Sequence, residues 1–189
     1  MSEHKLEGLR VAILATDFFE EAELIETRKA LQEAGARTFV IAPKSGELQA
    51  VRHDKKTQKV KVDMTLDQAK PDEFDAVLLP GGAMNADALR MDKKAQEFVK
   101  AFDREGKPIA VICHGPWLLI SAGLVKGRHM TSYYTIQDDL KNAGAVWNDM
   151  VSLRDRNWVS SRKPDDIPQF NKNMIELFSE SRQKSRKVA

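Results

Sequence analysis

The chain contains a single cysteine among its 189 residues. One cysteine cannot form an internal disulfide, so the disulfide framework that many small secreted proteins use is excluded. Residues 1–8 carry several charged side chains, and no apolar segment of the kind found in secretory signals precedes the first apolar run. We therefore expect a cytoplasmic protein.

Long apolar runs and an excess of one charge are also missing. No stretch approaches the roughly 18 apolar residues that a membrane-spanning helix needs. The 30 basic and 28 acidic residues leave a formal net charge of +2, so we expect neither a nucleic acid nor a membrane as partner. The strongest basic run is the tail at 181–189, which we expect to be a frayed, solvated end.

Apolar runs and helical patterns alternate along the rest of the chain. This order predicts an α/β fold with an open, mainly parallel sheet covered by helices on both faces. No repeat or linker divides the chain, so we expect one domain over 1–189 with its core at about 9–180. Strands are predicted at 10–15, 37–42, 75–79, 108–112, 128–130, 145–147, 151–153 and 158–160. Short strands or a hairpin are expected within 44–70, and helices at 20–34, from Gly82 to Gly106, and at 117–123, 136–143 and from 164 onwards.

Cys113 directly follows a buried strand and precedes a short helix. Such a turn lifts a side chain above the sheet edge, and a helix N-terminus lowers the pKa of a thiol by stabilising the thiolate. His114 supplies a backbone N–H for an oxyanion and an imidazole that can move a proton. The alternative is that Cys113 is simply a small buried apolar side chain. Metal binding is not expected, because Cys113 and His114 are adjacent and no second Cys/His cluster exists.

Two more strand ends carry candidate groups. Gly81 and Gly82 could turn backbone N–H groups towards a carbonyl oxygen, or could form an ordinary strand-to-helix turn. They are not a dinucleotide fingerprint, and no P-loop occurs, so no cofactor is predicted. Glu20, Glu21 and Glu23 could be a solvated first helical turn, or one of them could share a hydrogen bond with the thiol. A carboxyl group in that position must be protonated, because its charge would otherwise oppose the thiolate.

With these segments identified, the sequence resembles the ThiJ/PfpI superfamily, in particular its PfpI-like branch of intracellular cysteine peptidases and deglycases. The most specific match is Ala110–Pro116, which is similar to the nucleophile signature of that family. Supporting matches lie at Phe19–Leu24, Leu79–Gly82, Thr131–Tyr133, Asp138–Asp139 and Ser160–Asp166. The resemblance implies a flavodoxin-like three-layer sandwich, as in class I glutamine amidotransferases.

The resemblance also implies roles for individual residues. Cys113 is the expected nucleophile, with His114 beside it and Glu23 hydrogen-bonded to the thiol, and Gly82 and His114 are expected to donate N–H groups to the oxyanion. Asp87 is the best match to an acidic residue that reaches the site of a neighbouring subunit, although its loop is one residue longer than usual. Gly81, Trp117 and Tyr133 are expected to line the substrate pocket, and Trp117 replaces a glutamine of many members. A homodimer or hexamer is expected, with the site near a subunit interface.

The implied activity is that of a cofactor-independent cysteine hydrolase. It would act on small electrophilic carbonyl adducts, as a protein deglycase or glyoxalase III does, or on peptides, in a stress-protection role. The competing hypothesis is a non-catalytic redox sensor or holdase chaperone that uses the same oxidisable cysteine. A glutamine amidotransferase shares the fold but needs a late catalytic histidine, and no histidine follows Lys141.

Overall fold

The short apolar runs of the sequence form a seven-stranded central sheet. The computed structural model describes residues 5–188, with side-chain surroundings up to residue 181. The strand order is β11-β12-β8-β7-β1-β3-β6, and every neighbouring pair is parallel except β11 and β12. These strands are β1 (Arg10–Leu14), β3 (Arg37–Ala42), β6 (Met64–Thr65), β7 (Ala76–Leu79), β8 (Ile109–Ile112), β11 (Ser152–Asp155) and β12 (Trp158–Ser161).

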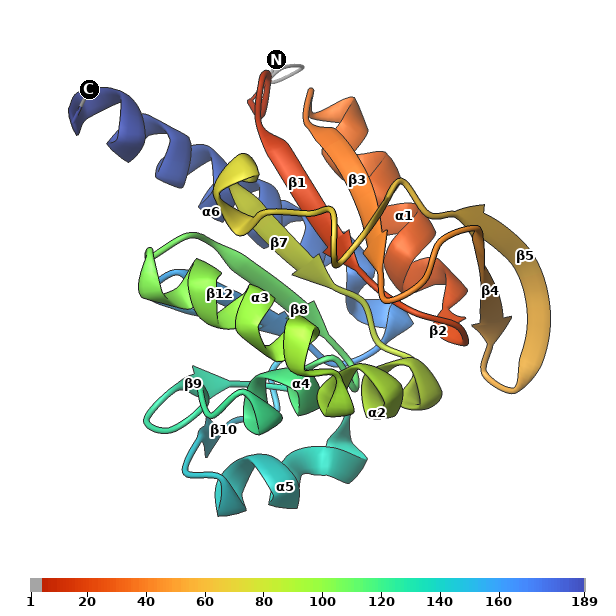
Figure 1. The fold of residues 1–189 in the computed structure, drawn as a ribbon. Coiled ribbons are helices and arrows are strands. Elements are labelled where there is room, and N and C mark those ends of the chain that lie inside the picture. The colour runs from red at the N-terminus through yellow and green to blue at the C-terminus, as the bar shows by residue number, and fades with distance from the viewer. Residues whose placement is uncertain (1–4, 189) are drawn as a thin grey trace.

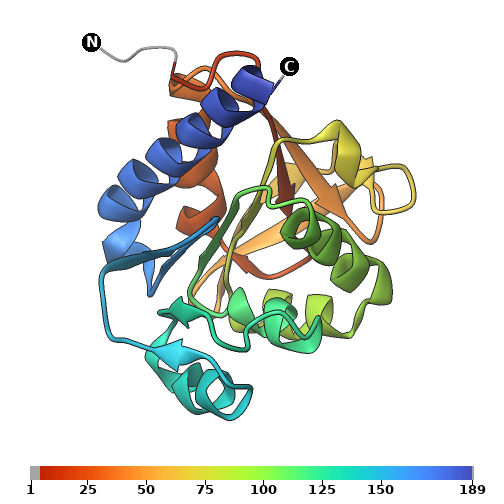
Figure 2. The same cartoon turned by 90° about the vertical axis from the view of Figure 1, so that its left-hand side faces the viewer.

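Helices cover both faces of this sheet, as the two views in Figures 1 and 2 show. On one face, α1 (Glu21–Glu33) and α6 (Ile167–Val188) pack side chains such as Leu31 and Phe170 against Ile13. On the other face, α3 (Lys93–Arg104) packs Phe98 against Val77. The remaining helices are α2 (Ala83–Met91), α4 (Pro116–Ser121), α5 (Gln137–Asn142) and the short 3-10 turns η1 (Pro71–Glu73), η2 (Tyr134–Ile136) and η3 (Pro164–Asp166). The predicted flavodoxin-like three-layer sandwich is confirmed.

Two small sheets flank the central sheet. The first joins β2 (Phe19–Glu20) to a hairpin of β4 (Glu47–Arg52) and β5 (Lys55–Lys61), which realises the hairpin predicted within 44–70. The second pairs β9 (His129–Met130) with β10 (Val146–Trp147). Because β2 leads directly into α1, the hairpin is held beside the first turn of that helix.

Two predictions about helices are wrong. The single helix expected between Gly82 and Gly106 is two helices, α2 and α3, which are separated at Asp92. Asp92 has extended backbone, and its carboxylate accepts hydrogen bonds from the N–H groups of Lys94 and Ala95, so it caps α3. The basic tail was expected to be frayed, but α6 continues to Val188.

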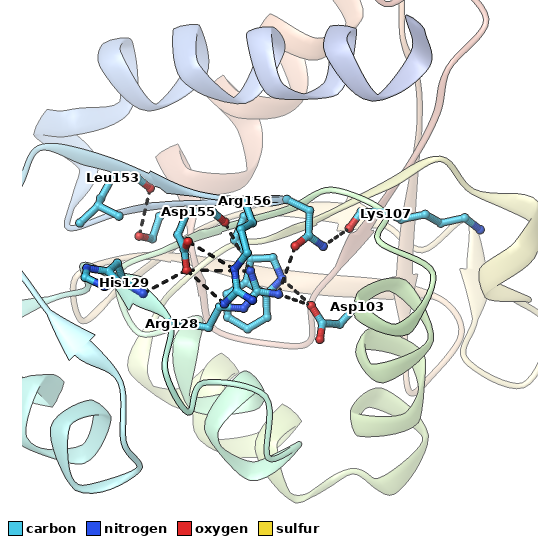
Figure 3. A network of polar contacts seen from close by, with 10 residues as sticks. Asp103, Lys107, Arg128, His129, Leu153, Asp155 and Arg156 are labelled. Atoms are coloured by element: carbon cyan, nitrogen blue, oxygen red, sulfur yellow. Dashed lines mark hydrogen bonds and ion pairs between the residues drawn. The ribbon is translucent and has the colours of Figure 1, made fainter. Parts of the chain in front are cut away.

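The amino end of the sheet, opposite the carboxyl strand ends, is closed by a polar network around Arg128 (Figure 3). The Arg128 guanidinium lies 4.0 Å from the centre of the Trp158 ring, and its Nη2 donates to Asp103 Oδ1 at 2.6 Å and to Asn157. Trp158 Nε1 donates to the same Asp103 oxygen at 2.9 Å. A buried cation is therefore paired and hydrogen-bonded, which is the condition for burying one without a large desolvation cost.

Within residues 5–188, no helix is both long enough and apolar enough to cross a membrane.

Candidate active site

Cys113 occupies a sharp turn between β8 and α4. Its φ of +63° lies in the left-handed region, which a side chain with a Cβ rarely adopts. The turn is fixed on both sides, because the Cys113 N–H donates to Ser161 O at 3.1 Å and the Cys113 carbonyl accepts from the N–H of Tyr133 at 2.9 Å. At Gly115, an added Cβ would lie 2.8 Å from the Val111 side chain and 2.9 Å from Leu79 O, so only glycine fits there. The turn therefore places the Cys113 sulfur beyond the carboxyl end of β8.

Glu23 lies beneath this sulfur, in the first turn of α1, and is fully buried. Burial, together with the nearby charge of Glu20, raises the pKa of Glu23 from 4.5 to about 8. Its Oε2 accepts a hydrogen bond from the N–H of Gly81 at 2.8 Å. The carboxyl group also shares a hydrogen bond with the Cys113 side chain, and burial outweighs the effect of both bonds on its pKa. Glu23 is thus a proton-bearing group at neutral pH.

Three groups approach the sulfur of Cys113 from above the sheet. His114 Nδ1 lies 3.1 Å from Sγ, and the backbone N–H groups of Gly82 and His114 both donate towards it. Burial raises the pKa of the thiol well above its ordinary value, and an ionised Glu23 raises it further, whereas these two N–H groups lower it. The sequence-based expectation of a lowered thiol pKa does not hold for the resting site, because Cys113 is only 6% exposed. The thiol therefore needs a base to be activated.

His114 can act as that base. Burial lowers its pKa, so the imidazole is neutral and able to accept a proton near neutral pH. Its ring stacks on Tyr133 with 4.8 Å between centroids and meets the edge of Trp117 at 5.2 Å. Trp117 is itself anchored, because its Nε1 donates to Asp139 Oδ2 at 2.8 Å. Two aromatic side chains thus limit how the imidazole can turn.

A pocket of about 840 Å³ opens above these groups. The predicted residues Cys113, His114, Glu23, Gly82 and Tyr133 all line it. Its outer wall is formed by β2, the start of α1, the β4–β5 hairpin and the residues around η3. The charged side chains there are of both signs: Glu20, Glu21, Glu26, Arg52, Asp54, Lys56, Lys163 and Asp165. This volume is in the range typical of small-molecule sites.

Three predicted residues lie elsewhere. Gly81 is beneath the pocket, where an added Cβ would lie 2.4 Å from Glu23 Oε2 and 2.6 Å from Cys113 Cβ. Trp117 lies behind His114 and does not line the pocket. Asp87 is exposed on α2 and does not line the pocket of its own chain.

Sequence reasoning missed Asn85, which is fully buried immediately behind the two glycines. It makes three hydrogen bonds to the backbone at the ends of β1 and β7. The only sequence signal was an asparagine three residues after Gly82, within a segment that reads as ordinary helix. No group of three or more His, Cys, Asp or Glu side chains in the described chain is arranged to hold a metal ion.

Comparison with known proteins identifies the family of the chain. The model of the DJ-1/PfpI family matches residues 9–177. Deglycase PfpI of Pyrococcus furiosus is 41% identical over 170 residues, which cover 90% of this chain and 99% of that protein. Protein/nucleic acid deglycase 2 of Escherichia coli is 40% identical over 170 residues, covering 89% and 97% of the two chains. The crystal structure of Drosophila melanogaster DJ-1beta superposes with a TM-score of 0.83 at 25% identity, over 95% of this chain and 96% of that one. The chain belongs to the DJ-1/PfpI family.

Proposed function

We propose that the protein is a cysteine-nucleophile hydrolase that removes small carbonyl adducts from amines and thiols. The observation that carries this proposal is the site around Cys113. A strained thiol with an imidazole nitrogen at 3.1 Å, two N–H donors and a protonated carboxyl group opens into a pocket. Relatives about 40% identical over most of the chain are named deglycases, which is the activity we extend to this chain.

The proposed chemistry uses the Cys113 thiol, the His114 imidazole, two backbone N–H groups and water. His114 Nδ1 takes the thiol proton as Sγ forms a bond to an electrophilic carbonyl carbon. The electron pair of the carbonyl moves to its oxygen, and the N–H groups of Gly82 and His114 stabilise the resulting oxyanion. In a peptide or another acyl adduct, the leaving amine or thiol is bonded to the attacked carbon, so collapse of the oxyanion breaks that bond and His114 gives the proton to the leaving group. In a methylglyoxal adduct, the amine or thiol is bonded to the neighbouring carbinol carbon. There the carbinol O–H proton passes through His114 to the amine or thiol as their bond breaks, and Sγ adds to the aldehyde that re-forms. A proton that His114 moves from the former aldehyde carbon to the ketone carbon converts this hemithioacetal into a thioester. Water then hydrolyses the acyl-enzyme to a carboxylic acid and the free Cys113 thiol.

The test is hydrolysis of methylglyoxal adducts of an amine and a thiol, with free methylglyoxal and a peptide panel run in parallel. Cys113→Ala should abolish turnover of the true substrate class, and Cys113→Ser should retain a small fraction, because serine keeps the geometry but is a weaker nucleophile. Unchanged turnover in Cys113→Ala would refute the proposal. The panel also separates deglycase, glyoxalase III and peptidase activities.

We further propose that the site is completed by a second copy of the chain. Asp87 shares an exposed face of α2 with Met84 and Met91, which are 61% and 76% exposed. Met84 also lines the pocket of Cys113, so a partner seated on this face would bring its own acidic group close to that pocket. Asp87→Ala should lower activity, and mixing it with Cys113→Ala should restore part of it through mixed oligomers. No recovery on mixing would place Asp87 outside the partner's site.

A redox sensor or holdase remains the second candidate, on one observation. The Cys113 sulfur receives two backbone N–H donors and faces a protonated carboxyl group, an arrangement that also stabilises an oxidised, anionic sulfur. Reduced and peroxide-treated protein should be compared for turnover and for suppression of aggregation. A gain in aggregation suppression on oxidation favours the sensor, whereas loss of turnover without that gain favours the enzyme.

A further inference from the structure

Asn85 is a fully buried amide that belongs to no predicted motif. It lies in α2, and its Oδ1 accepts a hydrogen bond from the N–H of Thr16 at 2.7 Å. Because a backbone N–H can only donate, the atom facing Thr16 must be the amide oxygen. The amide nitrogen therefore faces the other way, and there it donates to Pro80 O at 3.3 Å and to Gly81 O at 3.0 Å.

These two carbonyls belong to the two peptide groups that serve the active site. The peptide between Pro80 and Gly81 carries the N–H that bonds Glu23 at 2.8 Å. The next peptide, between Gly81 and Gly82, carries the N–H that donates towards the Cys113 sulfur. In a trans peptide the C=O and N–H point in opposite directions within one plane. Because Asn85 holds both carbonyls on one side, the two N–H groups point to the opposite side, towards Glu23 and the Cys113 sulfur.

The Gly81–Gly82 peptide needs such a restraint. Neither flanking residue has a Cβ to limit rotation of the peptide plane, and Gly82 has a φ of +90°. Apart from Asn85, its carbonyl accepts only one further backbone hydrogen bond among the described residues, a longer one of 3.3 Å from the N–H of Glu20. A hydrogen bond to the carbonyl also polarises the peptide and strengthens its N–H as a donor.

We propose that Asn85 is a positioning residue, which holds the Gly82 N–H as an oxyanion donor and the Gly81 N–H on Glu23. This proposal deepens the proposed function, because it identifies the side chain that orients half of the oxyanion site. Asn85 touches neither the substrate pocket nor the sulfur; it acts through the two glycine peptides.

Three substitutions test this role. Asn85→Asp keeps the acceptor for Thr16 and the shape of the side chain, but it replaces the two N–H donors that serve the carbonyls by an oxygen that carries at most one proton. Asn85→Ala removes all three bonds, and Asn85→Ser is a milder variant that can supply one hydroxyl donor. The matched control is Asn157→Ala, which removes an amide that bonds Lys107 O at 2.9 Å at the opposite end of the sheet.

Two readouts separate positioning from mere stability. In adduct hydrolysis, Asn85→Asp should lower kcat about 10- to 100-fold, which is a smaller loss than removal of an oxyanion donor causes. KM should change less than about threefold. In the second readout, iodoacetamide alkylates Cys113, the only cysteine, without any substrate. Loss of the Gly82 donor to the thiolate should move the pH profile of alkylation upward. Asn157→Ala should lower the melting temperature while leaving both readouts at the wild-type level.

The outcomes are distinct. If folded Asn85 variants match the wild type in kcat and in alkylation profile, or if Asn157→Ala shows the same losses, Asn85 is not a positioning residue. If the wild type hydrolyses no adduct but the alkylation profile still shifts in Asn85→Asp, the proposed function fails while the positioning role stands. Circular dichroism of each variant identifies any that does not fold, and Asn85→Ser then replaces Asn85→Ala.

Discussion

Replacing Glu23 by glutamine removes one titrating group from the site while keeping the acceptor for the Gly81 N–H. In the folded protein the pKa of Glu23 is raised from 4.5 to about 8, so the folded chain holds this proton more tightly than the unfolded chain. The stabilisation is complete below about pH 4.5 and is lost as the pH rises through about 8. The wild type should therefore lose stability across this window, whereas Glu23→Gln should not.

The magnitude follows from the shift itself. Each pH unit inside the window corresponds to about 1.4 kcal/mol, and the whole rise corresponds to about 5 kcal/mol. Urea unfolding of both proteins at several values from about pH 5 to about pH 8 gives the free energy of unfolding at each. The difference between the two curves isolates Glu23, because every other titrating group is common to both. Parallel curves would refute a buried, protonated Glu23.

Three further predictions test the geometry. Gly81→Ala should lower kcat by about 10²-fold, because the new Cβ would lie 2.4 Å from Glu23 Oε2 and would displace Glu23 and Cys113. In the control, Gly123→Ala, the new Cβ meets no atom within 4 Å, so only stability should fall, and equal kcat values in the two variants would contradict the prediction. Arg128→Leu should lower the free energy of unfolding by about 3 kcal/mol, because it leaves the Asp103 carboxylate without its cation, and kcat per folded molecule should not change. Urea titration measures the free energy of unfolding, and a decrease below about 0.5 kcal/mol would refute the prediction. Trp117→Ala should lower kcat about tenfold, because the His114 ring would be free to turn, whereas Trp117→Phe should lower kcat less than about threefold. A wild-type kcat in Trp117→Ala would show that the imidazole needs no support from this side chain.

The mainly parallel sheet and most of its strands were predictable because their signals are local. Strands such as β7 and β8 are continuous apolar runs, and buried parallel strands leave that pattern in the sequence. The break between α2 and α3 was missed although Asp92 is a good helix cap and Leu89 is out of phase with the apolar stripe of Ala95, Phe98 and Phe102. The continuation of α6 through the basic tail was missed because charge suggests exposure but does not by itself end a helix.

Only those residues of the site that directly follow a strand could be placed from the sequence. Cys113 and Gly82 follow adjacent parallel strands, so topology alone brings their turns together. The raised pKa of Cys113 was not predictable, because it depends on how deeply the sulfur is buried and on the neighbouring carboxyl group. Asn85 was not predictable either, since its oxygen bonds Thr16, which is 69 residues away along the chain. Trp117 was misplaced because its position in the helix does not reveal that Asp139 turns its indole away from the pocket.

The left-handed backbone of Cys113 has a consequence for which nucleophiles this fold can accept. A φ of +63° costs about 1–2 kcal/mol for any residue with a Cβ, and a β-branched side chain crowds that conformation still more. Serine has the same branching as cysteine and can replace it at no added backbone cost. Threonine cannot, so evolution or engineering at this turn can exchange sulfur for oxygen but cannot readily install a threonine nucleophile.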